Sequence, residues 1–120
     1  MPDEPWKIPD EVADLVRESI DRLETLHVLF LLQSTAPRGW SVRDVSLERR
    51  SSRYAAETSL RTLARHGFLV NEDEAYHFGP RTSDLSAKTK ALADCYRSRP
   101  TAVIALIFSG KNDRGPNDTG

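Results

Sequence analysis

Residues 41–70 read SVRDVSLERRSSRYAAETSLRTLARHGFLV, and this stretch decides the fold of the chain. Ser41 and Asp44 have the three-residue spacing of a capping box, in which Asp stands where Glu or Gln is usual. They predict a short helix that begins directly after Ser41. Ser51 and Ser52 offer a fresh N-cap, so a second helix is expected to follow the first closely.

The second helix is expected to be amphipathic and to span residues 52–66. Its apolar face is built at helical spacing from Ala56, Leu60, Leu63 and Ala64. Its opposite face carries Tyr54, Thr58, Arg61 and Arg65. Gly67 then supplies a residue that tolerates the left-handed conformation in which many helices end.

A β-hairpin is predicted directly after this helix. The apolar or aromatic runs Phe68–Val70 and Ala75–Phe78 flank the polar stretch Asn71–Glu74, which is typical of two strands around a turn. The order short helix, amphipathic helix, glycine and hairpin is that of a helix-turn-helix followed by a wing.

Further helices are predicted before this core. Apolar residues recur at helical spacing over residues 10–33, with Asp10 as the N-cap. This segment forms either one bent helix or two, the second of them capped by Ser19 or Asp21. Its final part, HVLFLL, is apolar nearly all round and is therefore expected to be the central core helix.

The residues after the hairpin also predict helices. Ser83 is expected to cap a helix that Pro100 ends, and Thr101 to cap the apolar run Ala102–Phe108. We expect this run to be a mostly buried helix, docked on its own core or placed in a dimer interface. The expected organisation is a disordered N-terminus at residues 1–9, a winged-helix domain with flanking helices at residues 10–109, and a disordered tail at residues 110–120.

Charge is distributed unevenly along the chain. The formal net charge is only −1, so no global positive field attracts nucleic acid. Residues 38–66, however, hold seven arginines against three acidic residues, a net charge of +4, whereas residues 1–37 hold eight acidic residues against three basic ones. Arginine is the side chain suited to forked contacts with phosphates and guanines.

The stretch quoted above resembles the DNA-reading core of winged-helix regulators of the MarR-like and PadR-like kind. In those proteins a Ser-led recognition helix ends in the pattern L-x-x-L-x-x-x-G-F/L, which here runs from Leu60 to Phe68. The segment YRSRPTAVIALI at residues 96–107 is similar to the tail of small bacterial winged-helix proteins. The resemblance covers about residues 20–109. It implies a mainly α (α+β) fold, a winged helix-turn-helix with a two-stranded wing and additional N- and C-terminal helices.

The resemblance also implies a function, that of a transcriptional regulator which binds double-stranded DNA as a homodimer. The helix at 52–66 would lie in the major groove, with its N-terminal residues nearest the base edges. Its candidate contacts to bases or phosphates are Arg53, Tyr54, Thr58 and Arg61. Candidate contacts to backbone phosphates are Ser41, Arg43, Arg49, Arg50, Ser51 and Ser52. In the alternative reading these residues form a solvated helix face, Ser52 serves only as a cap and Tyr54 leans into the core.

The predicted wing departs from this resemblance. Its tip carries Glu72, Asp73 and Glu74, where a wing that contacts DNA normally carries Arg or Lys. Phosphates would repel three carboxylates, so the wing either points away from DNA or meets a basic partner. A second function therefore stays open, a winged-helix protein–protein interaction module in a signalling or polymerase-associated complex.

Catalysis and cofactor binding find no support in the sequence. It contains no Gly-rich phosphate loop, no H-E-x-x-H and no C-x-x-C motif. His27, His66 and His77 lack the short spacing of metal ligands, so neither a metal nor a cofactor is expected. The single Cys95 excludes an internal disulfide, and the charge of Asp94 beside it disfavours a reactive thiolate.

A cytoplasmic location is expected from three features. A single cysteine fits a reducing compartment. The longest apolar runs, Val28–Leu32 and Ala102–Phe108, are far shorter than the ~20 residues that span a bilayer. The N-terminal sequence MPDEPWK is acidic and lacks the basic and apolar regions of a secretory signal.

Overall fold

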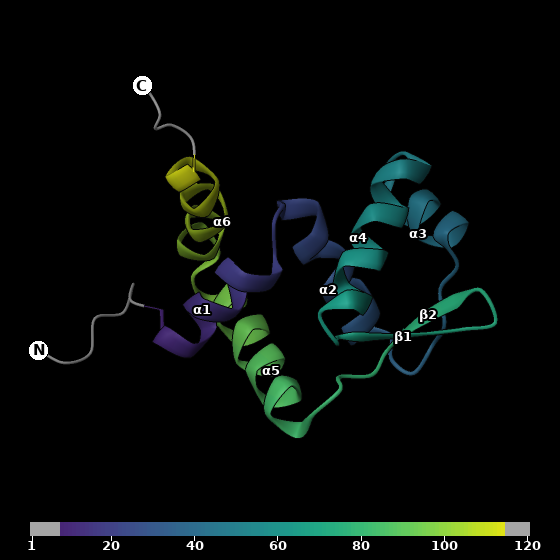
Figure 1. Cartoon of the computed structure of the whole chain (residues 1–120), viewed down its shortest axis with the longest axis horizontal. Helices are drawn as coiled ribbons and strands as arrows, with labels where there is room; N and C mark the ends of the chain where they lie inside the picture. Colours follow the sequence, from purple (N-terminus) through teal and green to yellow (C-terminus); the bar gives the residue numbers. More distant parts are fainter. Residues whose placement is uncertain (1–7, 115–120) are drawn as a thin grey trace, which may run out of the picture. The chain divides into compact units, whose positions relative to one another are not determined.

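The computed structural model describes residues 8–114 of the chain (Figure 1). Its elements are, in chain order, α1 (Asp10–Ser19), α2 (Leu23–Ser34), α3 (Val42–Arg49), α4 (Arg53–Arg65), β1 (Leu69–Glu72), β2 (Ala75–Phe78), α5 (Ser83–Ser98) and α6 (Pro100–Arg114). The predicted mainly α fold with a two-stranded wing is confirmed. The sequence led us to expect one domain over residues 10–109. In the structure, contacts between residues group the chain into two compact units. One comprises residues 24–86, and the other comprises residues 8–23 together with residues 87–114.

The core of the 24–86 unit is formed by α2 and α4. As the sequence predicted, α2 is a core helix, and it fully buries Leu26, Val28, Leu29 and Leu32. The apolar face of α4 is buried through Ala56, Leu60 and Leu63. A hydrogen bond between the fully buried hydroxyls of Thr25 and Ser59, with oxygen atoms 3.3 Å apart, links the two helices.

The starts of α3 and α4 follow the predicted caps. The Ser41 Oγ accepts a hydrogen bond from the Asp44 N–H at 3.0 Å, and Asp44 Oδ2 accepts one from the Ser41 N–H at 3.4 Å, which completes the capping box. Ser52 Oγ accepts from the Ala55 N–H at 3.0 Å and caps α4. Each helix therefore begins where its own sequence signal indicates.

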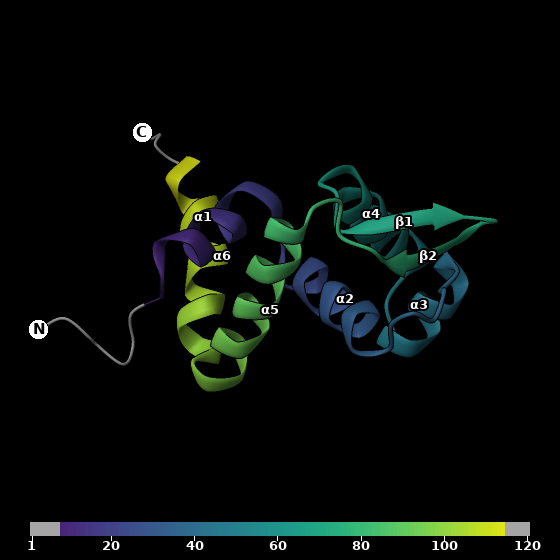
Figure 2. The same cartoon turned by 90° about the horizontal axis from the view of Figure 1, so that it is seen from below.

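The wing is an antiparallel hairpin in which Leu69 pairs with Phe78 and Glu72 with Ala75 (Figure 2). Its turn consists of Asp73 and Glu74 alone, with φ angles of 52° and 63°. Positive φ at both positions matches the right-handed twist of two-residue hairpins. The turn is thus shorter than the predicted polar stretch, because Asn71 and Glu72 belong to β1.

The base of the wing is tied to the loop before α3. The backbone N–H of Trp40 donates to the Tyr76 carbonyl at 2.7 Å, and the Tyr76 N–H donates back to the Trp40 carbonyl at 2.8 Å. The indole N–H of Trp40 also donates to Thr35 Oγ1 at 2.9 Å. These bonds hold β2 against the start of the α3–α4 pair.

The other unit contains α1, most of α5, and α6. Helix α1 packs against α6 and buries the stripe Val12, Leu15 and Val16. Residues 10–33 therefore form two helices, one of the two arrangements that the sequence left open. Because α2 begins at Leu23, neither Ser19 nor Asp21 holds its N-cap position.

Three other predicted caps are wrong, each because a neighbouring residue takes the position. Asp10 is the first residue of α1, and Pro9 precedes it as the N-cap. Thr82 caps α5 instead of Ser83, since its Oγ1 accepts from the Leu85 N–H at 3.0 Å. Helix α6 begins one residue before Thr101, at Pro100, whose missing N–H costs nothing in a first helical turn.

Helix α6 spans Pro100–Arg114 and buries one side of its apolar run within the chain. Val103 and Ile107 are buried, but Ala105 is exposed and Phe108 is 49% exposed, so a single stripe of this apolar run faces the core. The helix includes residues 110–114, which we predicted to be disordered, whereas residues 1–7 and 115–120 lie outside the described part. No helix between residues 8 and 114 is long and apolar enough to cross a membrane.

Candidate nucleic-acid interface

The outer face of α4 carries exposed polar and aromatic side chains. Arg53, Tyr54 and Arg61 are exposed, and Thr58 is half-buried. Tyr54 is 76% exposed, so the alternative in which it leans into the core is wrong. Arg61 Nη1 lies 3.7 Å from Glu57 Oε2 one helical turn away, and such an exposed pair restrains the guanidinium only weakly.

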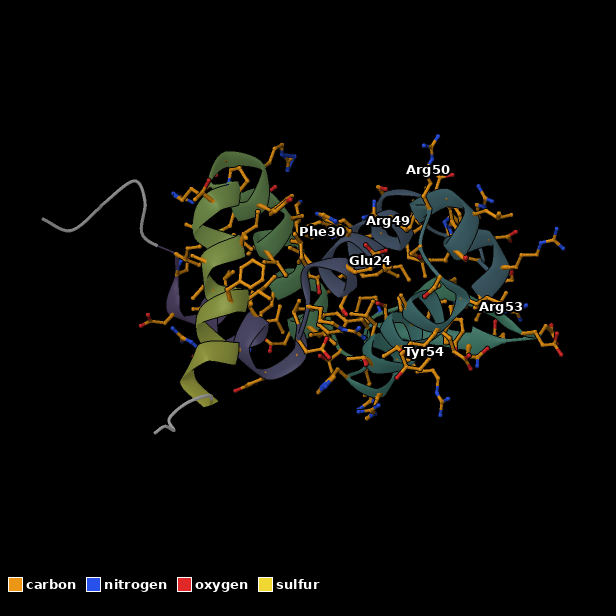
Figure 3. All side chains as sticks on the ribbon, turned by 90° about the horizontal axis from the view of Figure 1, so that it is seen from above. Glu24, Phe30, Arg49, Arg50, Arg53 and Tyr54 are labelled. Atoms are coloured by element: carbon orange, nitrogen blue, oxygen red, sulfur yellow. The ribbon has the colours of Figure 1, made fainter. Side chains whose placement is uncertain are left out.

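Two more arginines are exposed on α3 and in the turn that follows it. Arg43 lies in the first turn of α3, and Arg50 directly follows the helix. Figure 3 shows the side chains of Arg50 and Arg53 extending away from the ribbon. Within residues 8–108, where side chains are described, neither Arg43, Arg50 nor Arg53 forms an ion pair. Their charges are therefore available to an external anion.

Arg49 has a different environment from these residues. Its Nε donates to Glu24 Oε2 at 3.0 Å and its Nη2 to Glu24 Oε1 at 2.9 Å, a forked pair that links α3 to α2 (Figure 3). The two side chains are only 31% and 26% exposed. We predicted a phosphate contact for Arg49. Its guanidinium is instead hydrogen-bonded to the carboxylate of Glu24, a residue distant in sequence.

His27 completes this cluster from the next turn of α2. Its Nδ1 lies 3.0 Å from Arg49 Nη2 and accepts a hydrogen bond, because a guanidinium can only donate. Burial, and secondarily the positive charge of Arg49, lowers the pKa of His27 below its usual value, although Glu24 acts in the opposite direction. The imidazole is therefore held neutral, with its proton on Nε2.

No family model matches the chain, and no curated protein matches it. Among solved structures, it is similar to the crystal structure of MepR, a transcription regulator of the Staphylococcus aureus multidrug efflux pump MepA. The TM-score is 0.56 at 13% sequence identity, and the match covers 88% of this chain and 79% of the MepR chain. The chain has a winged-helix fold. In this winged helix, α3 and α4 form the helix-turn-helix and the β1–β2 hairpin is the wing.

The winged-helix structure divides the ten predicted contact residues into two groups. The exposed group consists of Arg43, Arg50, Ser52, Arg53, Tyr54 and Arg61. The half-buried group consists of Ser41, Arg49, Ser51 and Thr58. In the second group the Ser51 Oγ is buried and makes no hydrogen bond within the described residues, so it does not face an external phosphate.

Two further exposed arginines of the winged helix were not among the predicted DNA contacts. The Arg38 guanidinium lies over the Trp40 ring, 3.8 Å from its centroid, in the loop before α3. Arg65 is exposed in the last turn of α4. Both belong to the basic segment, and Arg65 also lies on the predicted polar face of the helix, so these were the available signals.

The wing tip is acidic and exposed, as its sequence indicated. Glu72, Asp73 and Glu74 are all exposed, and Glu72 Oε1 is 4.0 Å from His77 Nδ1. In the described part of the chain no group of three or more His, Cys, Asp or Glu side chains is arranged to hold a metal ion. Cys95 is buried, with Arg99 Nη1 3.9 Å from its sulfur atom.

Proposed function

We propose that this chain is a transcriptional regulator that binds duplex DNA with α4 in the major groove. The observation that carries the proposal is the two-sided character of α4. Leu60 and Leu63 are fully buried on one face, while Arg53, Tyr54 and Arg61 are exposed on the other. MepR, which has the same fold, is a transcription regulator, and this supports the proposal by analogy.

The exposed residues fall into two roles under this proposal. Arg53 and Tyr54 begin α4, and the N-terminal residues of a recognition helix lie nearest the base edges. Arg61 extends the same exposed face into the C-terminal half of the helix. Arg43 and Arg50 lie outside α4 and suit the backbone phosphates, which position a protein without reading sequence. Arg49 is left out because Glu24 already engages it.

We infer that the active species is a homodimer in the cytoplasm, without catalytic activity. The support for the homodimer is the apolar surface of α6, where Ala105 is exposed and Phe108 is 49% exposed. A two-fold dimer would read a pseudo-palindrome whose half-sites lie about 34–36 Å apart, or a multiple of that distance. Light scattering on the full chain tests this, and a monomer at the concentrations that saturate DNA would contradict it.

A second candidate function follows from the exposed acidic wing. Glu72, Asp73 and Glu74 would be repelled by phosphates, whereas a basic protein surface would attract them. In that case the domain is a protein-interaction module, and α4 has no preferred duplex.

The deciding experiment selects bound duplexes from a random library and then titrates the preferred duplex at two salt concentrations. Replacing a base-reading arginine, in Arg53→Ala or Arg61→Ala, should cost about 1–3 kcal/mol on the preferred site and relax preference at one base pair. Arg17→Ala is the matched control, because Arg17 is an exposed helical arginine of the other unit. If the wild-type chain binds no duplex at low salt, the DNA-binding proposal fails and the interaction module is favoured.

A further inference from the structure

The helices α3 and α4 end in the same backbone motif. After α4, the Gly67 N–H donates to the Ala64 carbonyl at 3.1 Å and the Phe68 N–H to the Leu63 carbonyl at 3.0 Å. This pair of bonds is the Schellman motif, which requires a left-handed residue just past the helix. Gly67 meets the requirement with a φ of 88°.

After α3 the same two bonds form around an arginine. The Arg50 N–H donates to the Leu47 carbonyl at 3.3 Å, and the Ser51 N–H donates to the Ser46 carbonyl at 3.0 Å. Arg50 adopts φ 55° and ψ 43°, which is the left-handed helical region. For a residue with a Cβ atom this conformation is strained, and glycine is the usual choice. The backbone at position 50 therefore favours glycine, although its φ lies within the left-handed region open to other residues and the φ of Gly67 lies beyond it.

The side chain of Arg50 does not offset this strain within the fold. It is exposed, and it forms neither an ion pair nor a hydrogen bond with any residue that the structure describes. The other non-glycine residues with positive φ in that part of the chain are Asp73 and Glu74, where the two-residue turn demands this conformation at both positions. Stability alone thus does not account for an arginine at position 50.

We propose that Arg50 contacts DNA from a position where the fold favours glycine. With arginine at this position the α3–α4 turn is less stable than it would be with glycine, but the protein binds DNA more tightly. The inference rests on the proposed function, which assigns Arg50 to the backbone phosphates, and adds that this contact is made at a cost in folding stability. Arg50 lies three residues before Arg53, the first residue of α4, and both side chains extend outward from this turn (Figure 3). A guanidinium at such a position contacts a backbone phosphate through its forked N–H donors.

The experiment compares Arg50→Gly and Arg50→Lys with wild-type protein in urea unfolding and in duplex titrations at 50 and 200 mM salt. Arg50→Gly should unfold at the same or a higher urea concentration, because the strain is removed and no internal contact is lost. It should bind DNA more weakly at low salt.

One lost phosphate contact lowers the salt slope of DNA binding by about 0.9. Over this fourfold salt range the wild type should therefore lose about 3.5-fold more affinity than the variant. Arg50→Lys should keep the wild-type salt dependence.

Two control variants test whether the effects are specific to position 50. One changes a left-handed backbone position elsewhere, and the other removes a positive charge elsewhere. Asp73→Gly makes the same left-handed replacement in the wing and should raise the urea midpoint without weakening DNA binding. Arg17→Ala removes an equal charge from the other unit and should leave the salt dependence unchanged.

The outcomes distinguish this inference from the proposed function. If the wild type binds duplex DNA and Arg50→Gly binds it with the same affinity and salt dependence, the inference is wrong and the function stands. If Arg50→Gly unfolds at a lower urea concentration, Arg50 stabilises the fold and the inference is also wrong. If the wild type binds no duplex, both fail together.

Discussion

The forked ion pair between Glu24 and Arg49 should contribute measurably to the stability of the 24–86 unit. Its two hydrogen bonds measure 2.9 and 3.0 Å, and its side chains are 26% and 31% exposed. Exposed pairs contribute about 0–1 kcal/mol, whereas removing one partner of a fully buried pair costs about 3–5 kcal/mol. The partial burial places this pair between the two limits. We therefore expect Glu24→Gln to lower the free energy of unfolding by about 2 kcal/mol.

A double-mutant cycle with Glu24→Gln and Arg49→Met isolates the interaction, because methionine keeps much of the apolar stem without the charge. The expected coupling energy is about 1–2 kcal/mol. Urea unfolding should be followed by the fluorescence of the buried Trp40, in a Trp6→Phe background that leaves Trp40 as the only tryptophan. A coupling energy below about 0.5 kcal/mol, the usual error of additivity, would refute the structural role assigned to this pair.

The same variants test whether Arg49 contacts DNA. If Glu24 occupies its guanidinium in the complex as well, the double variant should bind DNA with the salt dependence of the wild type. A salt slope reduced by about 0.9 would instead show that Arg49 leaves Glu24 for a phosphate, and our exclusion of Arg49 would be wrong.

Two further predictions concern pH and the wing. Because the pKa of His27 is lowered in the folded state, the unfolded chain binds more protons as the pH falls through about 6.5, so the stability should decrease below that pH. The decrease should be smaller in His27→Gln, and equal pH profiles of urea midpoints for the two proteins would contradict the assignment. Neutralising the wing tip by Glu72→Gln, Asp73→Asn and Glu74→Gln together should leave DNA affinity unchanged or raise it. Weaker binding of the variant in the duplex titration would mean that the wing carboxylates make favourable contacts when the protein is bound to DNA.

Local signals in the sequence predicted most of the fold correctly. The Ser41–Asp44 capping box, the Ser52 cap and the Gly67 helix end each act within four residues of chain, so they operate in any tertiary context. Helical periodicity likewise identified the buried face of α4, since burial of an apolar stripe needs only some core to pack against.

Predictions failed where neighbouring residues compete for one position. Ser83 and Thr82 are both good N-caps, and in the structure Thr82 Oγ1 accepts the capping hydrogen bond from the Leu85 N–H. For α6, the apolar composition of its run predicted a mostly buried helix, docked on its own core or placed in a dimer interface. How many sides of that helix are covered depends on which other helices pack on it, and here a stripe containing Val103 and Ile107 is buried.

Arg49 and Arg50 show most directly what the sequence alone determined and what it left to the tertiary structure. The sequence determined that a basic segment rich in arginine follows a short capped helix and precedes an amphipathic one. It could not distinguish these two neighbours, because they carry the same side chain. The structure separates them because consecutive residues at a helix end point in different directions. Arg49 meets the Glu24 carboxylate of α2, while the left-handed turn at Arg50 leaves its charge exposed.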